Sequence, residues 1–415
     1  MTATPEPAPR SAIGLLLSPV FGAFFTARLL TAMGNMLHAL VAAIAAFDVT
    51  GSAVVVGLVS VMQFAPQLLL GPLAGTWADG GNIKTQMLLG RALSTTGAGL
   101  LAVWFFWNPE LGVTAQTIAI LVSSALAGLG IVVGGPAMQA AVPSLVSRRE
   151  LPNAMALNTA PMTLGRVVGP AVGALTTAGF GYAPAFLMAG ICHLIFMALI
   201  ALIHFPTAEP VAGDEHHTMV DALRFVRGNK TVLLTLIAIS ALGFGSEPAI
   251  TLAPPLAHEL GGSTIAVGAL TTSVGIGALI GVVISTAVAN RLPQGVVASA
   301  GMILMAVSFG VCAFPLPQWA ASLAFAFSGL GFIVAVSAVS ILMQLELPAN
   351  LRGRVMALWL MGFLGSRPVA AMITGAISDT WGVHIGFGCV AFALLGVAVI
   401  CRSGRLAPPR PPATA

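Results

Sequence analysis

Charged side chains are scarce in this chain. They make up 7% of its 415 residues, whereas a soluble protein carries about 25% because its surface must face water. Since 57% of the residues are hydrophobic, we expect most of the surface to face an apolar medium instead. A bilayer core about 30 Å thick takes about 20 apolar residues per spanning helix, and the sequence holds a dozen such stretches. The composition therefore predicts a polytopic α-helical membrane protein.

Motifs for metal, phosphate and nucleophilic chemistry are also missing. The chain has four cysteines, each alone in an apolar stretch, so no disulfide framework or zinc site is indicated. It has no Gly-x-x-x-x-Gly-Lys-Ser/Thr loop, which argues against ATP as the energy source, and no His-Glu-x-x-His or Gly-x-Ser-x-Gly segment. We therefore expect no metal, no cofactor and no enzymatic activity. The cysteines are Cys192, Cys312, Cys389 and Cys401.

Twelve apolar stretches separated by turn residues define the predicted organisation. A polar segment at residues 205–230 divides them into two six-helix bundles. It ends in an amphipathic run, which predicts a short helix on the membrane surface. The predicted parts are a cytoplasmic tail at 1–18, bundles at 19–204 and 231–402 around the 205–230 linker, and a proline-rich disordered tail at 403–415. The predicted spans are 19–47, 53–77, 84–107, 114–140, 153–178, 182–204, 231–259, 263–289, 295–314, 318–345, 353–379 and 382–402.

An internal repeat supports two similar halves. Residues 50–57 resemble residues 261–268, an offset of 211. The run 155–157 followed by Arg166 matches 356–358 followed by Arg367, an offset of 201. Chance similarity between apolar helices is the alternative, but polar residues that match at equal spacing favour duplication. Duplicated halves with a binding site at their interface are typical of secondary transporters.

The positive charges are distributed unevenly along the chain. Thirteen of the 17 lysine and arginine residues fall in the two terminal segments and in alternate loops, and the intervening loops hold none. This asymmetry follows the positive-inside rule and predicts that both termini are cytoplasmic. Orientation in the lipid bilayer thus explains the net charge of +4, and no nucleic-acid partner is expected.

Three sequence blocks carry a family resemblance: residues 48–53 running into 71–79, residues 143–154, and residues 351–358. In these blocks, and over about residues 20–402, the chain resembles the major facilitator superfamily, in particular the branch of enterobactin exporters and macrolide efflux proteins. The resemblance implies an all-α membrane protein of twelve transmembrane helices in two pseudo-symmetric six-helix bundles. It also implies a monomeric secondary transporter in the bacterial inner membrane, with a small-molecule substrate and protons as the coupling ion.

The loop after the second span resembles the signature gating loop of this superfamily. Gly75, Asp79 and Lys84 match it, whereas Gly80, Asn82 and Ile83 stand where a basic residue, a glycine and a basic residue are expected. The resemblance implies that Asp79 meets the N-terminal end of the eleventh helix, where free N–H groups favour an anion, and so holds the cytoplasmic side shut. The missing basic residues imply a weaker latch. A plain helix-end carboxylate is the alternative interpretation of Asp79.

The fifth span contains a pattern that resembles the antiporter motif of exporters. Gly165, Gly169 and Gly173 recur every four residues, so they line one helix face and let another backbone approach closely. Pro170 removes a backbone donor and permits a bend. We expect this face to seal the two halves against each other. Ordinary small-residue packing is the alternative.

Charged residues inside spans are costly and usually face a cavity or a partner. Glu247 is the one carboxylate well inside a span. It is either a proton-coupling group, because a desolvated glutamate can titrate near neutral pH, or one member of a permanent ion pair with an arginine. The repeat offset places Glu247 level with Met36 of the first span, between Asn35 and His38, so Glu247 could share a cavity with Asn35 and His38. The cavity candidates are Arg28, Asn35, His38, Gln63, Arg91, Arg166 and Arg367.

Together these observations predict a proton-coupled exporter, an antiporter of small amphipathic molecules such as antibiotics or siderophores, that works by alternating access. An importer of a small metabolite is the alternative within transport. A non-transporting membrane sensor or assembly partner is the alternative outside it. Four arginines lie inside spans with one glutamate, which favours an anionic or polar substrate unless some of these arginines serve packing or gating.

Overall fold

The computed structural model describes residues 10–80, 82–107, 110–147, 149–205, 219–289, 291–348 and 351–401. Within these ranges all regular structure is helical. The helices are α1 (Ala12–Leu16), α2 (Pro19–Thr50), α3 (Ala53–Gly80), α4 (Ile83–Trp107), α5 (Gly112–Ser144), α6 (Leu151–Phe180), α7 (Tyr182–Leu202), α8 (Met219–Gly228), α9 (Lys230–Ser246), α10 (Pro248–Thr251), α11 (Ala253–Glu259), α12 (Thr264–Val288), α13 (Gln294–Val311), α14 (Gln318–Glu346), α15 (Arg352–Trp381) and α16 (Val383–Ile400).

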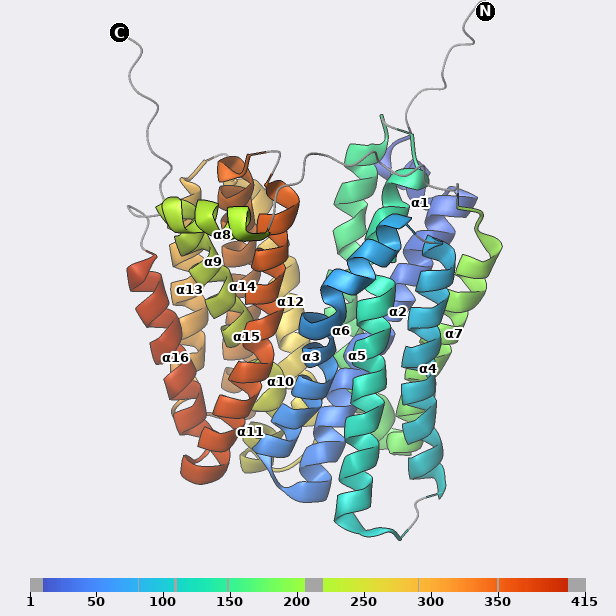
Figure 1. Ribbon diagram of the computed structural model, residues 1–415. Helices are drawn as coiled ribbons and strands as arrows, with labels where there is room; N and C mark the ends of the chain where they lie inside the picture. Colours follow the sequence, from blue (N-terminus) through green and yellow to red (C-terminus); the bar gives the residue numbers. More distant parts are fainter. Residues whose placement is uncertain are drawn as a thin grey trace, which may run out of the picture.

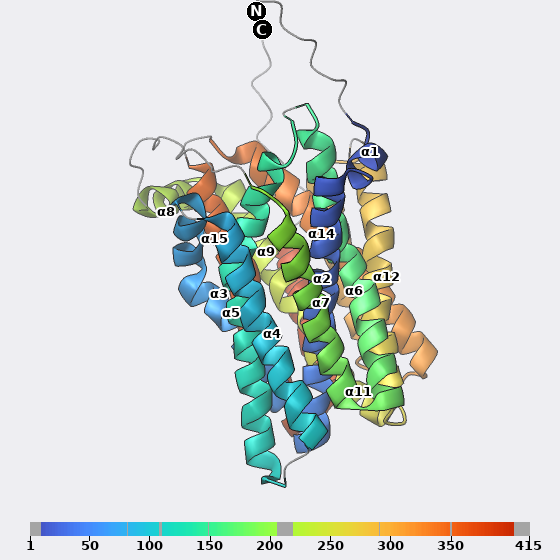
Figure 2. The same cartoon turned by 90° about the vertical axis from the view of Figure 1, so that its right-hand side faces the viewer.

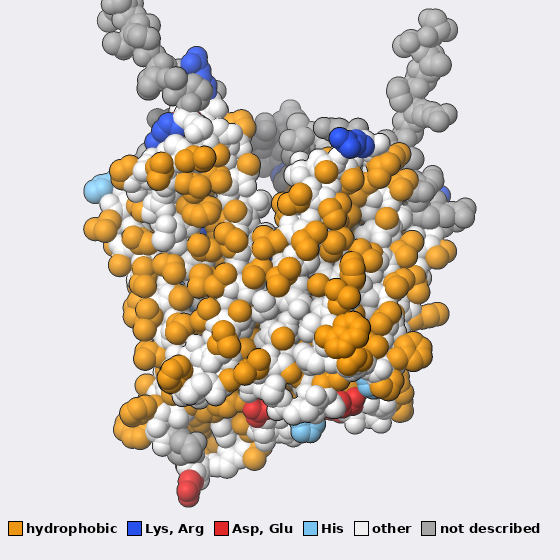
Figure 3. Space-filling view, turned by 180° about the vertical axis from the view of Figure 1, so that it is seen from behind, with side chains coloured by type: hydrophobic (Ala, Val, Ile, Leu, Met, Phe, Trp, Pro, Cys, Tyr) orange, Lys and Arg blue, Asp and Glu red, His pale blue; other side chains and the backbone are white. Residues whose placement is uncertain are grey.

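The long helices stand side by side in two groups (Figures 1 and 2). The first group holds α2 to α7 and the second holds α9 to α16, while the short amphipathic α8 lies across one end of the second group. We call the end that carries α1 and the last turn of α16 the inner end, and the opposite end the outer end. On the face seen in Figure 3, lysine and arginine side chains gather at the inner end and acidic side chains at the outer end.

Eleven stretches of the described chain are long and apolar enough to cross a membrane. The predicted fifth span is not among them, although α6 has 30 residues and is as long as its neighbours. Its polarity has a structural reason, because α6 is packed between α2 and α12. A Cβ atom added at Gly165 would meet Ala32 of α2, and one added at Gly275 of α12 would meet the backbone of Arg166. Two faces of α6 thus pack closely against other helices, where small and polar residues are tolerated, and only the remaining surface must face lipid.

The predicted span 231–259 is not one continuous helix, and this corrects the sequence reading. It is divided into α9, α10 and α11, with Glu247 at the first break. Pro248, Pro254 and Pro255 account for the breaks, because proline lacks the backbone N–H and clashes with the preceding turn. The predicted tail at 1–18 likewise contains a helix, α1, whose N-terminus is capped by the Ser11 hydroxyl through the Gly14 N–H at 3.2 Å. The expected disordered tail at 403–415 lies outside the described residues.

The two groups meet along two helix pairs, α6 with α12 and α3 with α15. A Cβ atom added at Gly57 of α3 would lie 2.7 Å from the Ala371 carbonyl oxygen of α15, and one at Gly375 would lie 2.6 Å from the Ala53 oxygen. Because α3 begins at the outer end, these contacts close the interface there. At the inner end the surface is notched between the two groups (Figure 3). The structure is therefore an outer-closed conformation.

Candidate functional site

The buried carboxylate of Glu247 lies where the two groups meet. The Arg367 Nε atom of α15 donates to Glu247 Oε2 at 2.8 Å. The Ser60 hydroxyl of α3 donates to Oε1, and the Thr251 hydroxyl lies 3.4 Å from the same oxygen. Glu247 itself has no exposed surface. It is thus held by one residue from the first group and two from the second, and the arginine partner of the ion-pair interpretation is Arg367.

Arg367 adds a second contact across the same interface. Its guanidinium carbon lies 3.8 Å from the centroid of the Phe64 ring of α3, which is a close cation–π arrangement. Ser60 and Phe64 are four residues apart on α3, so one face of this helix presents both side chains to the ion pair. We call Ser60, Phe64, Glu247 and Arg367 the central cluster.

Arg166 of α6 lies beside this cluster without a counter-ion. Its guanidinium carbon is 5.3 Å from the centroid of the Phe332 ring of α14. Within the part of the chain that the structure describes, it makes no hydrogen bond and no ion pair. The Phe332 ring in turn stacks on the Phe363 ring of α15 with centroids 6.1 Å apart, and Phe363 lies one helical turn before Arg367. The structure therefore brings two of the predicted cavity arginines together with Glu247.

The other cavity candidates belong to a polar network inside the first group. Arg91 is fully buried and donates to Thr31 Oγ1 at 2.9 Å, to Asn35 Oδ1 at 3.4 Å and to the Gly130 carbonyl at 2.8 Å. His193 Nδ1 lies 3.0 Å from the same Thr31 hydroxyl. Asn35 therefore has its polar partner within the first group, which does not support the cavity that we expected it to share with Glu247.

The three remaining candidates also contact the first group. His38 Nε2 lies 3.4 Å from the Ser123 hydroxyl of α5. Arg28 donates to the Met138 carbonyl at 3.2 Å, also on α5. Gln63 is 5% exposed, and its backbone is so close to α5 that a Cβ atom at Gly128 would lie 2.4 Å from its carbonyl oxygen. These contacts indicate that the three residues contribute to packing within the first group.

The antiporter-like glycines also pack within the first group. Added Cβ atoms at Gly165 and Gly169 would lie 2.8 and 2.7 Å from atoms of α2, and one at Gly173 would meet Leu37 at 3.2 Å. The seal that we expected between the halves is therefore made by the neighbouring face of α6. There the Ala174 side chain and the Pro170 carbonyl approach Gly268 of α12. Four-residue spacing identified a close-packing face but not which neighbour occupies it.

The predicted gating loop is described in part. Lys84 Nζ donates to the carbonyls of Ala201 at 2.6 Å and Ile203 at 3.0 Å, so its charge caps the C-terminal end of α7. A Cβ atom at Gly75 would meet nothing within 4 Å. The side chain of Asp79 lies outside the described residues, so its role as a gate stays a prediction.

A contact between the two groups at the outer end was missed by the sequence analysis. Asp379, near the end of α15, accepts from the Ser52 hydroxyl at 2.6 Å, the Ala53 N–H at 2.7 Å and the Val54 N–H at 3.1 Å. It therefore caps the N-terminus of α3 from the opposite group, and we call these four residues the outer clasp. A signal was available, since Gly375 precedes Asp379 by four residues, as Gly75 precedes Asp79.

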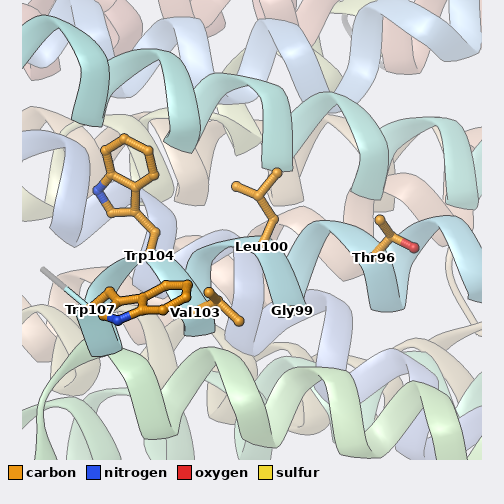
Figure 4. Close-up of a pocket in the computed structure, with 6 residues that line it drawn as sticks. All are labelled: Thr96, Gly99, Leu100, Val103, Trp104 and Trp107. Carbon is orange, nitrogen blue, oxygen red and sulfur yellow. The ribbon is translucent and has the colours of Figure 1, made fainter. Parts of the chain in front are cut away.

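One pocket of the described structure lies away from these residues. Its volume is about 680 Å³, and all its lining residues come from α4. Figure 4 shows the two indole rings together at one end of it. Trp107 is 79% exposed and Val103 is 54% exposed, so the pocket opens on the outside of the bundle, where lipid is expected. The lining residues are Thr96, Gly99, Leu100, Val103, Trp104 and Trp107.

Comparison with known proteins places this geometry in context. A family model described as a transmembrane secretion effector matches residues 10–410. The enterobactin exporter EntS of Salmonella typhimurium is 26% identical over 403 residues, which cover 94% of this chain and 95% of the relative. EntS of Citrobacter koseri is 26% identical over 410 residues, covering 95% and 94%.

Two solved structures share the fold. A D-xylose–proton symporter has a TM-score of 0.71 at 14% identity, covering 91% of this chain and 97% of the other. A bacterial homologue of the iron transporter ferroportin, solved in an inward-facing state, has a TM-score of 0.69 at 15% identity, covering 93% and 97%. The predicted all-α transporter fold is confirmed by these matches.

Proposed function

This chain belongs to the transmembrane secretion effector family of the major facilitator superfamily, and we propose that it exports small amphipathic molecules by alternating access. It is a membrane transporter and not an enzyme. The outward direction rests on the names of its curated relatives, which are enterobactin exporters. Antibiotics and siderophores fit the proposed size and amphipathic character. We further propose that it works as a monomer in the bacterial inner membrane, with both termini cytoplasmic, because its positive charges follow the positive-inside rule.

Two features of the interface support alternating access. The outer end is held by the outer clasp and by the close glycine contacts of α3 with α15. A further contact joins Gly365 of α15 to Leu68 near the middle of α3, but among the described glycines none closer to the inner end links these two helices, and the surface there is notched. Opening the outer end requires these contacts to separate while others form at the inner end. Such rocking of one half against the other is how duplicated transporters expose a central site in turn to each side.

We propose Glu247 as the proton-coupling residue, and its place across the interface is the observation that carries this proposal. The ionised carboxylate accepts from Arg367 within the second group and from Ser60 of the first group. A proton on Glu247 weakens both interactions, because hydrogen bonds to charged acceptors are about twice as strong as neutral ones. Protonation therefore favours separation of α3 from the ion pair, which links the charge of Glu247 to the conformation. The transporter then carries solute outward with Glu247 ionised and returns to the inward-facing state with Glu247 protonated. Solute and proton thus move in opposite directions, which is antiport.

The test is transport by purified protein in liposomes under an imposed pH gradient. Glu247→Gln should lose the acceleration of solute flux by the gradient and keep solute exchange at equal pH. Because removing one member of a buried pair can cost about 3–5 kcal/mol, the double variant Glu247→Gln/Arg367→Gln should be measured beside it. Glu346→Gln is the matched control, since Glu346 lies at the inner end of α14 and accepts only from Asn229 at 3.3 Å among the described contacts. Unchanged gradient-driven flux in Glu247→Gln would remove this residue from the mechanism.

A further inference from the structure

The charges beside Glu247 do not cancel, and this imbalance points to a substrate class. We propose, resting on the proposed export function, that Arg166 and Arg367 together bind the acidic group of an aromatic organic anion. Arg166 belongs to the first group of helices and Arg367 to the second. The site is therefore composite, and each half of the transporter contributes one cation.

The first step of the argument is the charge count. Arg166 and Arg367 contribute two positive charges and Glu247 contributes one negative charge, so one positive charge is left without a partner. A lone cation inside a membrane protein is costly and usually faces a water-filled cavity or a partner. Arg166 has only the Phe332 ring beside it among the described contacts, so its N–H groups are available to a ligand. A planar guanidinium matches the two oxygens of a carboxylate better than any neutral group.

The second step is the aromatic wall next to these cations. The rings of Phe332 and Phe363 are stacked with centroids 6.1 Å apart, and Trp359 continues the stack at 5.9 Å from Phe363. Phe363 and Arg367 are four residues apart on α15, so ring and cation lie on one helix face. The buried Trp359 Nε1 donor has no acceptor among the described residues. A ligand with an aromatic body and an acidic group can stack on this wall, pair with the arginines and accept from the indole.

The third step concerns direction. Arg166 and Arg367 come from different groups and are linked through the stacked rings of Phe332 and Phe363, so they face the same site only while the halves are packed as in this outer-closed structure. When the halves rock open at the outer end, the two cations separate and the anion loses one of its partners. The site thus binds tightly toward the inner end and weakly toward the outer end, as export requires. An inside-negative membrane potential also favours outward movement of an anion.

The experiment uses three probes of one shape and different charge: 1-naphthoate, 1-naphthylmethanol and 1-naphthylmethylamine. Binding to the full chain in lipid nanodiscs is measured by calorimetry. The acid should bind at least about tenfold more tightly than the alcohol or the amine, because hydrogen bonds to charged groups exceed neutral ones. Arg166→Gln should weaken naphthoate binding by about tenfold to a hundredfold and leave the alcohol within about twofold. Arg227→Gln, at an exposed position of α8, is the matched control and should change neither.

Glu247→Gln is a second variant with the opposite expected sign. It removes the negative charge that neutralises Arg367, so naphthoate binding should become stronger, and this result supports the proposal even where Arg166→Gln does not fold. Equal affinities for the three probes, or weaker naphthoate binding in Glu247→Gln, would overturn it. Flux measurements separate the two proposals. Export of the alcohol or the amine without preference for the acid refutes the anion site alone, whereas no export of any probe refutes the export function.

Discussion

Removal of the Asp379 carboxylate should open the outer end of this transporter. The side chain is the only described link between the end of α15 and the first turn of α3 that carries a charge. It satisfies two backbone N–H groups that the helix itself cannot pair, and it lies at the positive end of the helix dipole. These interactions exist only while the two halves touch at the outer end, so their whole free energy favours the outer-closed conformation.

The magnitude follows from the kind of contact. Loss of an N-cap side chain costs about 0.5–2 kcal/mol, and a carboxylate at a helix N-terminus adds about 0.3–1 kcal/mol at an exposed site. Asp379→Ala should therefore destabilise the outer-closed conformation relative to the outer-open one by about 2 kcal/mol. This is roughly a 30-fold change in the ratio of the two populations. Asp379→Asn keeps the shape and loses the charge, so about 1 kcal/mol, or roughly fivefold, is expected.

Spin-label distances across the outer end provide the assay. Labels at Val113, at the start of α5, and Trp319, at the start of α14, sit on opposite groups and are exposed in the structure. The four native cysteines are replaced by serine in this background. The long-distance population should grow from wild type through Asp379→Asn to Asp379→Ala.

Asp48→Asn is the matched control for this measurement. Asp48 is an outer-end carboxylate that accepts from Tyr182, and both residues belong to the first group. It loses the same charge without touching the interface between the groups. An unchanged distribution in Asp379→Ala, or an equal shift in Asp48→Asn, would refute the reasoning.

Two further predictions concern packing and the N-terminal segment. Gly275→Ala places a methyl group 2.6 Å from the Arg166 carbonyl oxygen and should shift the same spin-label distances toward the open form, whereas Gly135→Ala, which meets nothing within 4 Å, should not. Arg10 donates to Glu150 from Nε at 2.6 Å and from Nη2 at 3.1 Å, and this contact holds the pKa of Glu150 well below its usual range. A carboxyl whose pKa is lower in the folded protein than in the unfolded chain stabilises the fold at pH values above its unfolded pKa, and this stabilisation is lost as the pH falls through its folded pKa. Arg10→Ala should therefore lower the melting temperature at pH 6–8. The loss of stability should be under about 1 kcal/mol for this half-exposed pair. The difference in melting temperature between wild type and Arg10→Ala should shrink in acid, and a difference that grows in acid contradicts the prediction.

The arrangement of helices was largely predictable because the bilayer fixes their length. Apolar runs between turn residues gave the long helices, and α6 was found from its length although its apolarity is below that of the others. The break at Glu247 was missed because mean hydropathy hides individual prolines. Pro248, Pro254 and Pro255 were visible in the sequence, and their effect on the backbone outweighs the apolar run around them.

The site was predictable as a set of residue types but not as a set of pairs. The cost of burying charge singled out Glu247 and four arginines, yet which arginine meets Glu247 depends on how α9 and α15 cross, 120 residues apart in the chain. Arg91 and Arg367 look alike in sequence. One is satisfied by hydroxyl, amide and carbonyl groups of its own bundle and the other by a carboxylate at the interface. Only the three-dimensional packing separates a structural arginine from one that lies at the junction of the halves.

The outer clasp has a counterpart in the first half of the sequence, with the same spacing between a glycine and an aspartate. Gly75 and Asp79 stand near the inner end of α3, and Gly375 and Asp379 stand near the outer end of α15, with the same spacing. In the described conformation the outer carboxylate caps the helix of the other half. A carboxylate that caps a helix across the interface can do so only when its own end is closed. The gate role predicted for Asp79 would place a second such carboxylate at the inner end, and the two contacts would then favour opposite conformations. On this prediction, the missing basic residues around Asp79 would weaken the inner contact and favour the outer-closed conformation, which is the one that the structure adopts.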